Sequence, residues 1–306
     1  VVNQASAVFP YIIQAPRFFA GEIKLGEMTQ TASAFGNLSD ALSFFRLMYD
    51  DFTAFRASII RLDGLRDADE KARHLPTIAT ADGVDVGLDD VQIRKPDGEI
   101  LVDDLSLRLV PGEALVVKGR SGSGKTTLFR GLSGLWPYSE GTFTRPPGTD
   151  TLFLSQVPYL PLADLRSVLT YPAPPSDFSE EELHQILVDV SLPHLVERLD
   201  EDEYWAKVLS PGEQQRVAFA RILLSQPKVV FLDEATSAVD EGLEYSLYKL
   251  IRTRLPETIV VSISHRSTTE RHHTKMLELL GEGGEFLGVV EIGNEDLFDG
   301  HGGSSL

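Results

Sequence analysis

The chain has 306 residues, a length that allows one large domain or two and a sizeable hydrophobic core. Its 42% hydrophobic and 24% charged residues are typical of a folded globular protein and exclude an extensively disordered chain. The formal net charge of -18 argues against nucleic acid as a partner, and the lack of cysteine excludes disulfides and thiolate metal sites.

The first 66 residues combine apolar stretches with helical spacing. Two of these stretches approach membrane-spanning length, but each carries prolines or charged residues such as Pro10, Pro16, Arg17 and Asp40. The apolar spacing over 39–66 predicts one long amphipathic helix. The composition of this part is compatible with the end of a membrane domain and also with a soluble helical cap. The chain starts without methionine, so we expect a fragment of a longer protein.

The pattern changes after this helical part. Residues 67–90 are charged or polar and predict a linker. Beyond them, compact apolar runs rich in β-branched residues alternate with helical patterns, as expected for strands that are buried on both faces of a mainly parallel sheet. These runs lie at 113–119, 150–155, 228–234 and 258–265.

A glycine-rich segment follows the first of these runs and precedes a helical pattern. It reads GRSGSGKTT and fits the pattern Gly-x-x-x-x-Gly-Lys-Ser/Thr of a phosphate-binding loop, or P-loop. The glycines allow backbone N–H groups to surround phosphate oxygens, while Lys125 would reach the β- and γ-phosphates and Thr126 would ligate Mg²⁺. The residues predicted to bind phosphate are Gly119, Arg120, Ser121, Gly122, Ser123, Gly124, Lys125, Thr126 and Thr127.

Two further strands are predicted to end in residues suited to phosphate hydrolysis. VVFLDE places Asp233 where it can support Mg²⁺ through water, and Glu234 where it can polarise an attacking water. SISH brings His265 to the same edge of the sheet, where it can contact the γ-phosphate. The two carboxylates could instead cap the next helix, and a lone histidine is more often structural. The P-loop favours the catalytic interpretation.

Residues 209–216, LSPGEQQR, predict the start of another helix. Ser210 and Glu213 form a capping box, Pro211 suits the first helical position, and Gly212 lets another group approach the backbone closely. The free N–H groups and the helix dipole at this end suit an anion.

The segments GRSGSGKTT, SQVPYLP with Gln156, LSPGEQQR, VVFLDE, SAVD with Asp240 and SISH occur in an order that resembles an ABC-type ATPase. The resemblance covers about residues 85–280 and implies an α/β fold of the P-loop NTPase class, with ATP and Mg²⁺ as cofactors. Small GTPases and RecA-like proteins lack a segment such as LSPGEQQR. By resemblance, Gln156 contributes to the metal site and to catalysis, and Asp240 belongs to the nucleotide site.

The resemblance further implies a homodimer in which two ATP molecules lie between head-to-tail domains. Ser210, Gly212 and Glu213 of one copy would then complete the site whose P-loop belongs to the other copy. The family pattern is Leu-Ser-Gly-Gly-Gln, so Pro211 and Glu213 depart from it, and Pro211 lacks one N–H group.

A second departure concerns the base. Lys95, followed by Pro96, stands where family members commonly carry an aromatic residue that stacks on adenine. We therefore expect weaker recognition of the base than of the phosphates.

Segments such as GLWPYSEGTFTRP resemble the branch that contains the peroxisomal fatty-acyl (ABCD) transporters and the bacterial YddA-like and SbmA/BacA-related permeases. This implies a half-size transporter, with lipid around the N-terminal helices, in a membrane such as the bacterial inner membrane and with its ATPase facing the cytoplasm. The transported substrate stays unidentified, because its contacts would lie largely in preceding helices. The expected organisation begins with the end of a transmembrane domain, with one or two membrane helices, over 1–66 and a linker over 67–90. An ABC-type nucleotide-binding domain over 91–285 and a tail over 286–306 follow.

Two alternatives remain open on the sequence: a soluble ABC-type ATPase that acts as a nucleotide-dependent switch without transport, and a degenerate cassette that only binds nucleotide. A switch protein commonly carries two cassettes, a coiled-coil insertion or a basic surface, and the sequence has none of them. Glu234 and His265 argue against a degenerate cassette.

Three residues outside the motifs carry simpler expectations. His272 and His273 are adjacent and lack the spacing of metal ligands, so we expect both on a solvated surface. Trp205 is expected to pack in the core rather than to contact a ligand.

Overall fold

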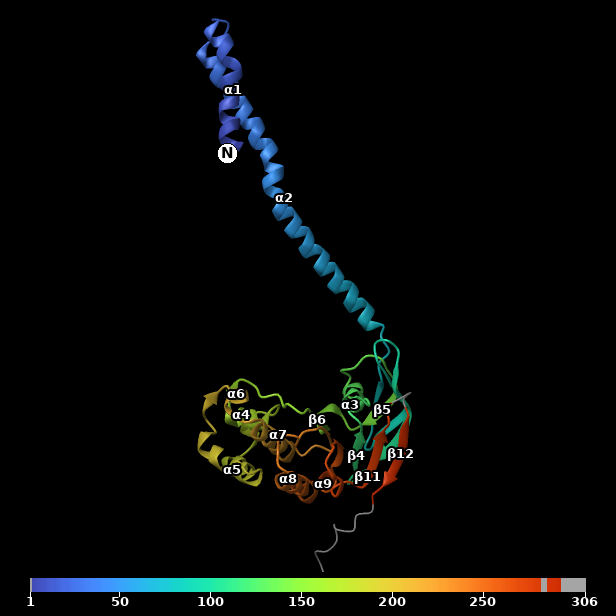
Figure 1. Ribbon diagram of the computed structural model, residues 1–306. Coiled ribbons are helices and arrows are strands. Elements are labelled where there is room, and N and C mark those ends of the chain that lie inside the picture. The colour runs from blue at the N-terminus through green and yellow to red at the C-terminus, as the bar shows by residue number, and fades with distance from the viewer. Residues whose placement is uncertain (1, 282–284, 293–306) are drawn as a thin grey trace, which may run out of the picture. The chain divides into compact units, whose positions relative to one another are not determined.

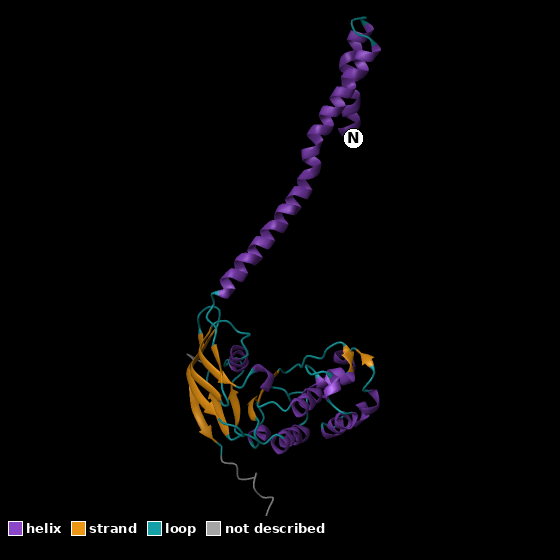
Figure 2. Ribbon diagram, turned by 180° about the vertical axis from the view of Figure 1, so that it is seen from behind, coloured by secondary structure: helices purple, strands orange, loops and turns teal. Residues whose placement is uncertain are grey.

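The computed structural model describes residues 2–281 and 285–292 and is drawn in Figure 1. The chain divides into two compact units, one up to His74 and one from Leu75 onward. The first unit is helical, and the described strands belong to the second (Figure 2).

The helical unit consists of α1 (Val2–Phe19) and α2 (Leu25–Arg73). The two helices pack side by side, with the rings of Phe9 and Phe35 5.7 Å apart. Helix α2 is longer at both ends than the helix predicted over 39–66. It continues through part of the predicted linker because alanine, glutamate, lysine and arginine favour helices, and because Asp69 and Arg73 form an i,i+4 ion pair of 2.9 Å.

Many large apolar side chains of this unit are exposed. Phe19, at 83%, and Leu65, at 68%, are among the most exposed of them. Within residues 2–281 and 285–292, no helix is both long and apolar enough to cross a membrane.

The second unit is built on a six-stranded sheet with the order β12-β11-β4-β10-β9-β6. All neighbouring strands are parallel except β12, which runs antiparallel to β11. The predicted strands are confirmed, and β12 lies within the segment that was expected to be a tail. The bounds are β4 Ala114–Gly119, β6 Thr151–Leu154, β9 Val229–Asp233, β10 Ile259–Ile263, β11 Lys275–Leu279 and β12 Phe286–Glu291.

A four-stranded sheet with the order β1-β5-β2-β3 covers one side of this unit. In this sheet β2 is antiparallel to both of its neighbours, and β1 is parallel to β5. The sheet starts before residue 91, where the domain was expected to begin. Its strands are β1 Ala79–Asp82, β2 Val86–Arg94, β3 Ile100–Leu109 and β5 Ser139–Arg145; a short pair consists of β7 Ala163–Asp164 and β8 Asp202–Glu203.

Helices connect the strands of the six-stranded sheet. The helices are α3 Lys125–Leu132, α4 Leu165–Thr170, α5 Glu180–Asp189, α6 Trp205–Val208, α7 Pro211–Ser225, α8 Glu241–Arg254 and α9 Ser267–Glu270, with 3₁₀ turns at Gly148–Asp150, Pro175–Asp177 and Pro193–Arg198.

Two hydrophobic cores lie on opposite faces of the six-stranded sheet. Strand β9 illustrates why, since successive side chains of a strand point to opposite faces. Val230 and Leu232 belong to the core that contains helices α4, α5, α7 and α8, whereas Phe231 belongs to the core with α3 and the antiparallel sheet. Phe231 stacks on Phe153 at 4.4 Å and meets Phe129 edge-on at 5.5 Å.

The expectation of a solvated surface for His272 and His273 is wrong. Both are buried, with 4% and 0% of their surface exposed. His273 bonds to the carbonyl oxygen of Thr269 at 2.7 Å and to Ser262 Oγ at 2.9 Å, and the His272 ring lies against Tyr245 and Tyr248. Burial lowers the pKa of His272 to about 4 and that of His273 to about 3.

Trp205 is fully buried, which confirms the expectation of a packing role.

These histidines predict acid sensitivity. Because their pKa is lower in the folded than in the unfolded state, protons bind the unfolded chain first, so stability is complete above about pH 6.5 and is lost below it. As the pH falls from 6.5 to 5, each histidine should lower the free energy of unfolding by about 2 kcal/mol. We expect the melting temperature of His273→Gln to fall less between pH 7 and pH 5 than that of the parent protein. The half-exposed His184, changed to Gln, serves as a control, and an equal fall in all three proteins would contradict the prediction.

Candidate functional site

The carboxyl ends of β4, β9 and β10 lie side by side. Ile263 of β10 pairs with Val117 of β4 on one side and with Asp233 of β9 on the other. Because ligands of open α/β sheets bind beyond the carboxyl ends of the strands, this edge is the place to look for the site. The P-loop, the pair Asp233–Glu234 and His265 all lie at this edge.

The P-loop has backbone conformations that favour glycine. Gly119, Gly122 and Gly124 have φ values of 142°, 86° and 97°. A Cβ atom on Gly119 would lie 2.3 Å from the carbonyl oxygen of Leu279, so a side chain at this position would clash with backbone. The loop therefore packs tightly on the end of β11, and α3 begins directly after the loop.

Lys125 lies within the curve of the loop. Its Nζ donates hydrogen bonds of 2.9 Å to the carbonyl oxygens of Gly119 and Arg120. Burial lowers the pKa of Lys125, and the carboxylates of Glu234 and Asp233 oppose that effect. Ser123 Oγ is buried in the same loop and has no hydrogen-bond partner among the described residues. Partly desolvated donors such as these suit a phosphate group.

Thr126 and Asp233 meet beside the P-loop. Thr126 Oγ1 donates a hydrogen bond of 3.1 Å to Asp233 Oδ1, and burial raises the pKa of Asp233 in spite of this bond. A hydroxyl and a carboxylate are the ligands that Mg²⁺ uses together with water and phosphate oxygens, so these residues fit the ion. In the described part of the chain, no cluster of three or more histidine or carboxylate side chains could hold a metal.

Glu234 and His265 line one pocket of about 100 Å³. Glu234 has a left-handed backbone with φ of 49°, which is rare outside glycine. Its Oε1 lies 3.3 Å from His265 Nε2, and its side chain is 30% exposed. The predicted base and the predicted γ-phosphate ligand therefore lie side by side and can both reach a group in this pocket.

The start of α7 has the predicted capping box. Ser210 Oγ and Ser210 N both donate to Glu213 Oε2, at 2.7 Å and 2.9 Å, and the Glu213 N–H donates back to Ser210 Oγ. His194 Nε2 lies 2.9 Å from Glu213 Oε1. Burial acts to raise the pKa of Glu213, but the hydrogen bonds from Ser210 and His194 outweigh it and leave the pKa below its ordinary value.

The loop between Glu234 and Asp240 is held by two residues that the sequence analysis missed. Gln215 of α7 donates from Nε2 to the carbonyl oxygen of Gln156 and to Ser237 Oγ, and it accepts the Ala238 N–H. A usable signal exists in the sequence: Gln215 precedes Ala218, Phe219 and Ile222 at helical spacing and so lies on the buried face of α7.

The second missed residue is Arg266, which follows His265. It donates to the carbonyl oxygens of Val239 and Ser237 at 2.7 Å and 3.3 Å, and it lies 3.5 Å from the buried carboxylate of Glu244. No local pattern marks Arg266, because its partners come from a segment more than twenty residues earlier in the chain.

The remaining predicted residues have contacts of their own. Gln156 Nε2 donates to Ser237 Oγ at 3.4 Å, and the Asp240 carboxylate caps α8 by accepting the Leu243 N–H at 3.0 Å. Lys95 pairs with Glu99 at 2.8 Å in the turn between β2 and β3, and that hydrogen bond raises the pKa of Lys95. The roles of these residues toward nucleotide or metal stay predictions.

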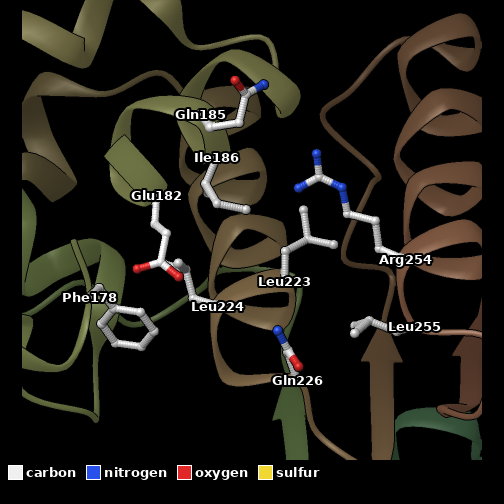
Figure 3. A pocket seen from close by; sticks show the side chains of 9 residues that line it. All are labelled: Phe178, Glu182, Gln185, Ile186, Leu223, Leu224, Gln226, Arg254 and Leu255. Carbon is white, nitrogen blue, oxygen red and sulfur yellow. The ribbon is translucent and has the colours of Figure 1, made fainter. Parts of the chain in front are cut away.

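A larger cavity, of about 310 Å³, lies among α5, α7 and the end of α8 (Figure 3). Phe178, Ile186, Leu223 and Arg254 contribute to its lining. None of the predicted site residues lines it, so size does not identify the functional site here.

Comparison with known proteins identifies the domain. The sequence profile of the ABC transporter family matches residues 102–237. The chain is 42% identical to an uncharacterized ABC transporter ATP-binding protein of Haemophilus influenzae, over 91% of the chain and 47% of that protein. It is 34% identical to the inner membrane ABC transporter ATP-binding protein YddA of Escherichia coli (87% and 46%) and 35% identical to the ATP-binding cassette sub-family D member 3 of mouse (67% and 32%).

The chain spans about half the length of the curated relatives it matches. The match to the Haemophilus protein covers more of the chain than the second unit can supply, so it includes part of the helical unit. The resemblance to the YddA-like and ABCD branch is thereby confirmed, as is the P-loop NTPase fold.

Gly212 provides a test of how the start of α7 is packed. A Cβ atom at this position would lie 2.9 Å from the backbone oxygen of Ala238. Gly212→Ala should therefore push α7 from the 237–239 segment and lower the free energy of unfolding by about 1–3 kcal/mol, measured in urea. Gly242→Ala is the matched control, because its Cβ would make only an ordinary contact at 3.4 Å. Equal stability of the two variants would contradict this packing.

Proposed function

Residues 102–237 belong to the ABC transporter family, whose members hydrolyse ATP, and on this premise we propose that the chain is the ATPase part of a half-size ABC transporter. In this proposal two copies close head to tail around two ATP molecules and so drive transport of a substrate across a membrane. The observation that carries the proposal is the meeting of Lys125, Asp233, Glu234 and His265 at one sheet edge.

Binding of ATP begins at the P-loop. We expect the β- and γ-phosphate oxygens to replace the two carbonyl oxygens that Lys125 Nζ contacts, since a phosphate oxygen is a stronger acceptor for an ammonium group. Thr126 and Asp233 would hold Mg²⁺, with Gln156 as a further predicted ligand. When bound, Mg²⁺ supplies positive charge that neutralises the β- and γ-phosphate oxygens.

Hydrolysis then needs a base near the γ-phosphate. Glu234 accepts a proton from a water molecule whose oxygen attacks the γ-phosphorus, and the bond from phosphorus to the bridging β–γ oxygen breaks. ADP leaves with the electron pair of that bond, and inorganic phosphate forms. His265, 3.3 Å from Glu234, holds the γ-phosphate and the water close to the carboxylate.

The second copy completes each site in this proposal. The start of α7 lies on a different element from the P-loop, and the described side-chain hydrogen bonds of Ser210 and Glu213 run between these two residues and to His194. The positive end of the α7 dipole and the N–H group of Gly212 suit an anion held by another molecule. We infer that Ser210, Gly212 and Glu213 face the γ-phosphate that the partner binds.

The helical unit connects this ATPase to a membrane. The exposed apolar side chains of α1 and α2 support contact with lipid or with preceding membrane helices. The relative named inner membrane ABC transporter ATP-binding protein YddA supports a location at the inner membrane. In this proposal the ATPase lies on the cytoplasmic side. This proposal also includes the transport of a substrate and the assembly of the whole protein as a homodimer.

Lys125→Ala tests the phosphate site. Loss of the ammonium group should weaken binding of Mg²⁺–ATP at least about 100-fold, because a buried charged hydrogen bond to each of two phosphates disappears. The dissociation constant can be measured with a fluorescent ATP analogue. Lys249→Ala, which removes an exposed lysine of α8, should bind as the parent does. Equal affinity of the Lys125→Ala variant would rule out this lysine as a phosphate ligand.

Glu234→Gln separates binding from chemistry. The variant should keep its affinity for ATP but lose at least about 100-fold in kcat, because the amide cannot accept the proton of the attacking water. With Mg²⁺–ATP it should form a stable dimer, measured by light scattering after size-exclusion chromatography. Hydrolysis at the parent rate would exclude Glu234 as the base, and a variant that stays monomeric with ATP would exclude the head-to-tail site.

A further inference from the structure

The loop formed by Ser237, Ala238 and Val239, called the 237–239 loop here, connects Glu234 to Asp240. The backbone N–H groups of Ser237 and Val239 bond within the turn, to Glu234 and Thr236. The Ser237 hydroxyl, the Ala238 N–H and the carbonyl oxygens of Ser237 and Val239 have partners that come from other elements. The loop is thus held from outside rather than by its own turn alone.

Gln215 holds one side of the loop. This side chain is 2% exposed and uses both ends of its amide. Its Oε1 accepts the Ala238 N–H at 2.9 Å, while its Nε2 donates to Ser237 Oγ at 3.1 Å and to the carbonyl oxygen of Gln156 at 3.0 Å. One buried side chain therefore ties α7 to the loop and to the residue that was predicted beside the metal.

Arg266 holds the other side. Its two terminal nitrogens donate to the carbonyl oxygens of Val239 and Ser237, at 2.7 Å and 3.3 Å. The buried carboxylate of Glu244 lies 3.5 Å from the guanidinium and also accepts hydrogen bonds from Thr236 and Thr268. Since Arg266 directly follows His265, a shift of the loop and a shift of His265 are coupled through one residue.

We propose that Gln215 and Arg266 are positioning residues that make the 237–239 loop, the start of α7 and His265 move as one body. This inference rests on the proposed function, in which α7 serves the partner's nucleotide and His265 serves the chain's own. The two side chains then couple the two sites of the dimer without touching either nucleotide. The buried amide of Gln215 and the partly buried guanidinium of Arg266 suit this role because a relative movement would break their hydrogen bonds to the loop.

The test uses two variants of the 306-residue chain, purified in mild detergent. Gln215→Met keeps the length of the side chain but removes its three hydrogen bonds. Arg266→Lys keeps the charge next to Glu244 but removes the planar fork whose two nitrogens reach the carbonyl oxygens of Val239 and Ser237. The controls are Gln214→Met, whose parent residue donates to the carbonyl oxygens of Ala206 and Leu209, and Arg254→Lys, whose parent residue pairs with Asp189 and does not line the pocket of Glu234 and His265.

Three quantities are measured for each variant: kcat, the Hill coefficient of ATP hydrolysis, and the affinity for Mg²⁺–ATP in the Glu234→Gln background. We expect kcat to fall about tenfold and the Hill coefficient to fall to about 1, while the affinity stays within about twofold. A role limited to stability would instead lower the melting temperature and the affinity together. The controls should keep the parent values of all three quantities.

The outcomes separate the two proposals. If the parent chain hydrolyses ATP without cooperativity and its Glu234→Gln variant stays monomeric, the proposed function fails and this inference fails with it. If the parent is cooperative and dimerises, but Gln215→Met and Arg266→Lys keep its kcat and Hill coefficient, only the inference is overturned. If Gln215→Met does not fold, Arg266→Lys alone decides between these results.

Discussion

The parallel pairing of β4, β9 and β10 is the constraint on which the rest of the site depends. Ile263 lies opposite both Val117 and Asp233, and the side chains next to these positions are buried in the two cores. A slip of one residue would turn Phe231 and its neighbours toward the wrong core, so hydrophobic burial holds the register. The same register places Asp233 beside the Thr126 hydroxyl.

Helix α7 connects this edge to the remainder of the domain. Its buried face contributes Val217, Phe219 and Ile222 to the larger core, which fixes where its first turn can lie. Gly212 then allows the backbone oxygen of Ala238 to approach closely, and Gln215 bonds to the same loop one turn later. Packing of ordinary apolar residues thus sets the position of the polar residues that we propose to serve the nucleotide sites.

Local patterns predicted the strands, the P-loop and the carboxylates at the end of β9, because each depends on residues that are close in the sequence. The sequence analysis wrongly predicted that His272 and His273 are exposed, because their burial depends on packing against Tyr245 and Tyr248 of α8. Arg266 escaped notice for the same reason, because its partners belong to another loop. Strand β12 joins the sheet by pairing with β11, a strand that the sequence analysis did not assign.

The departures from the family pattern at the start of α7 have a common electrostatic effect. Pro211 removes one N–H group, and the Glu213 carboxylate accepts both the hydroxyl and the N–H of Ser210. In the proposed dimer the Ser210 hydroxyl would have to donate to a phosphate oxygen instead of to Glu213, and the negative charge of Glu213 would remain close to the phosphate. His194 Nε2, 2.9 Å from Glu213 Oε1, can hold this carboxylate through a hydrogen bond. Closure around ATP should then depend on His194 as well as on the helix dipole, which is a property of this chain rather than of the glycine-rich family pattern.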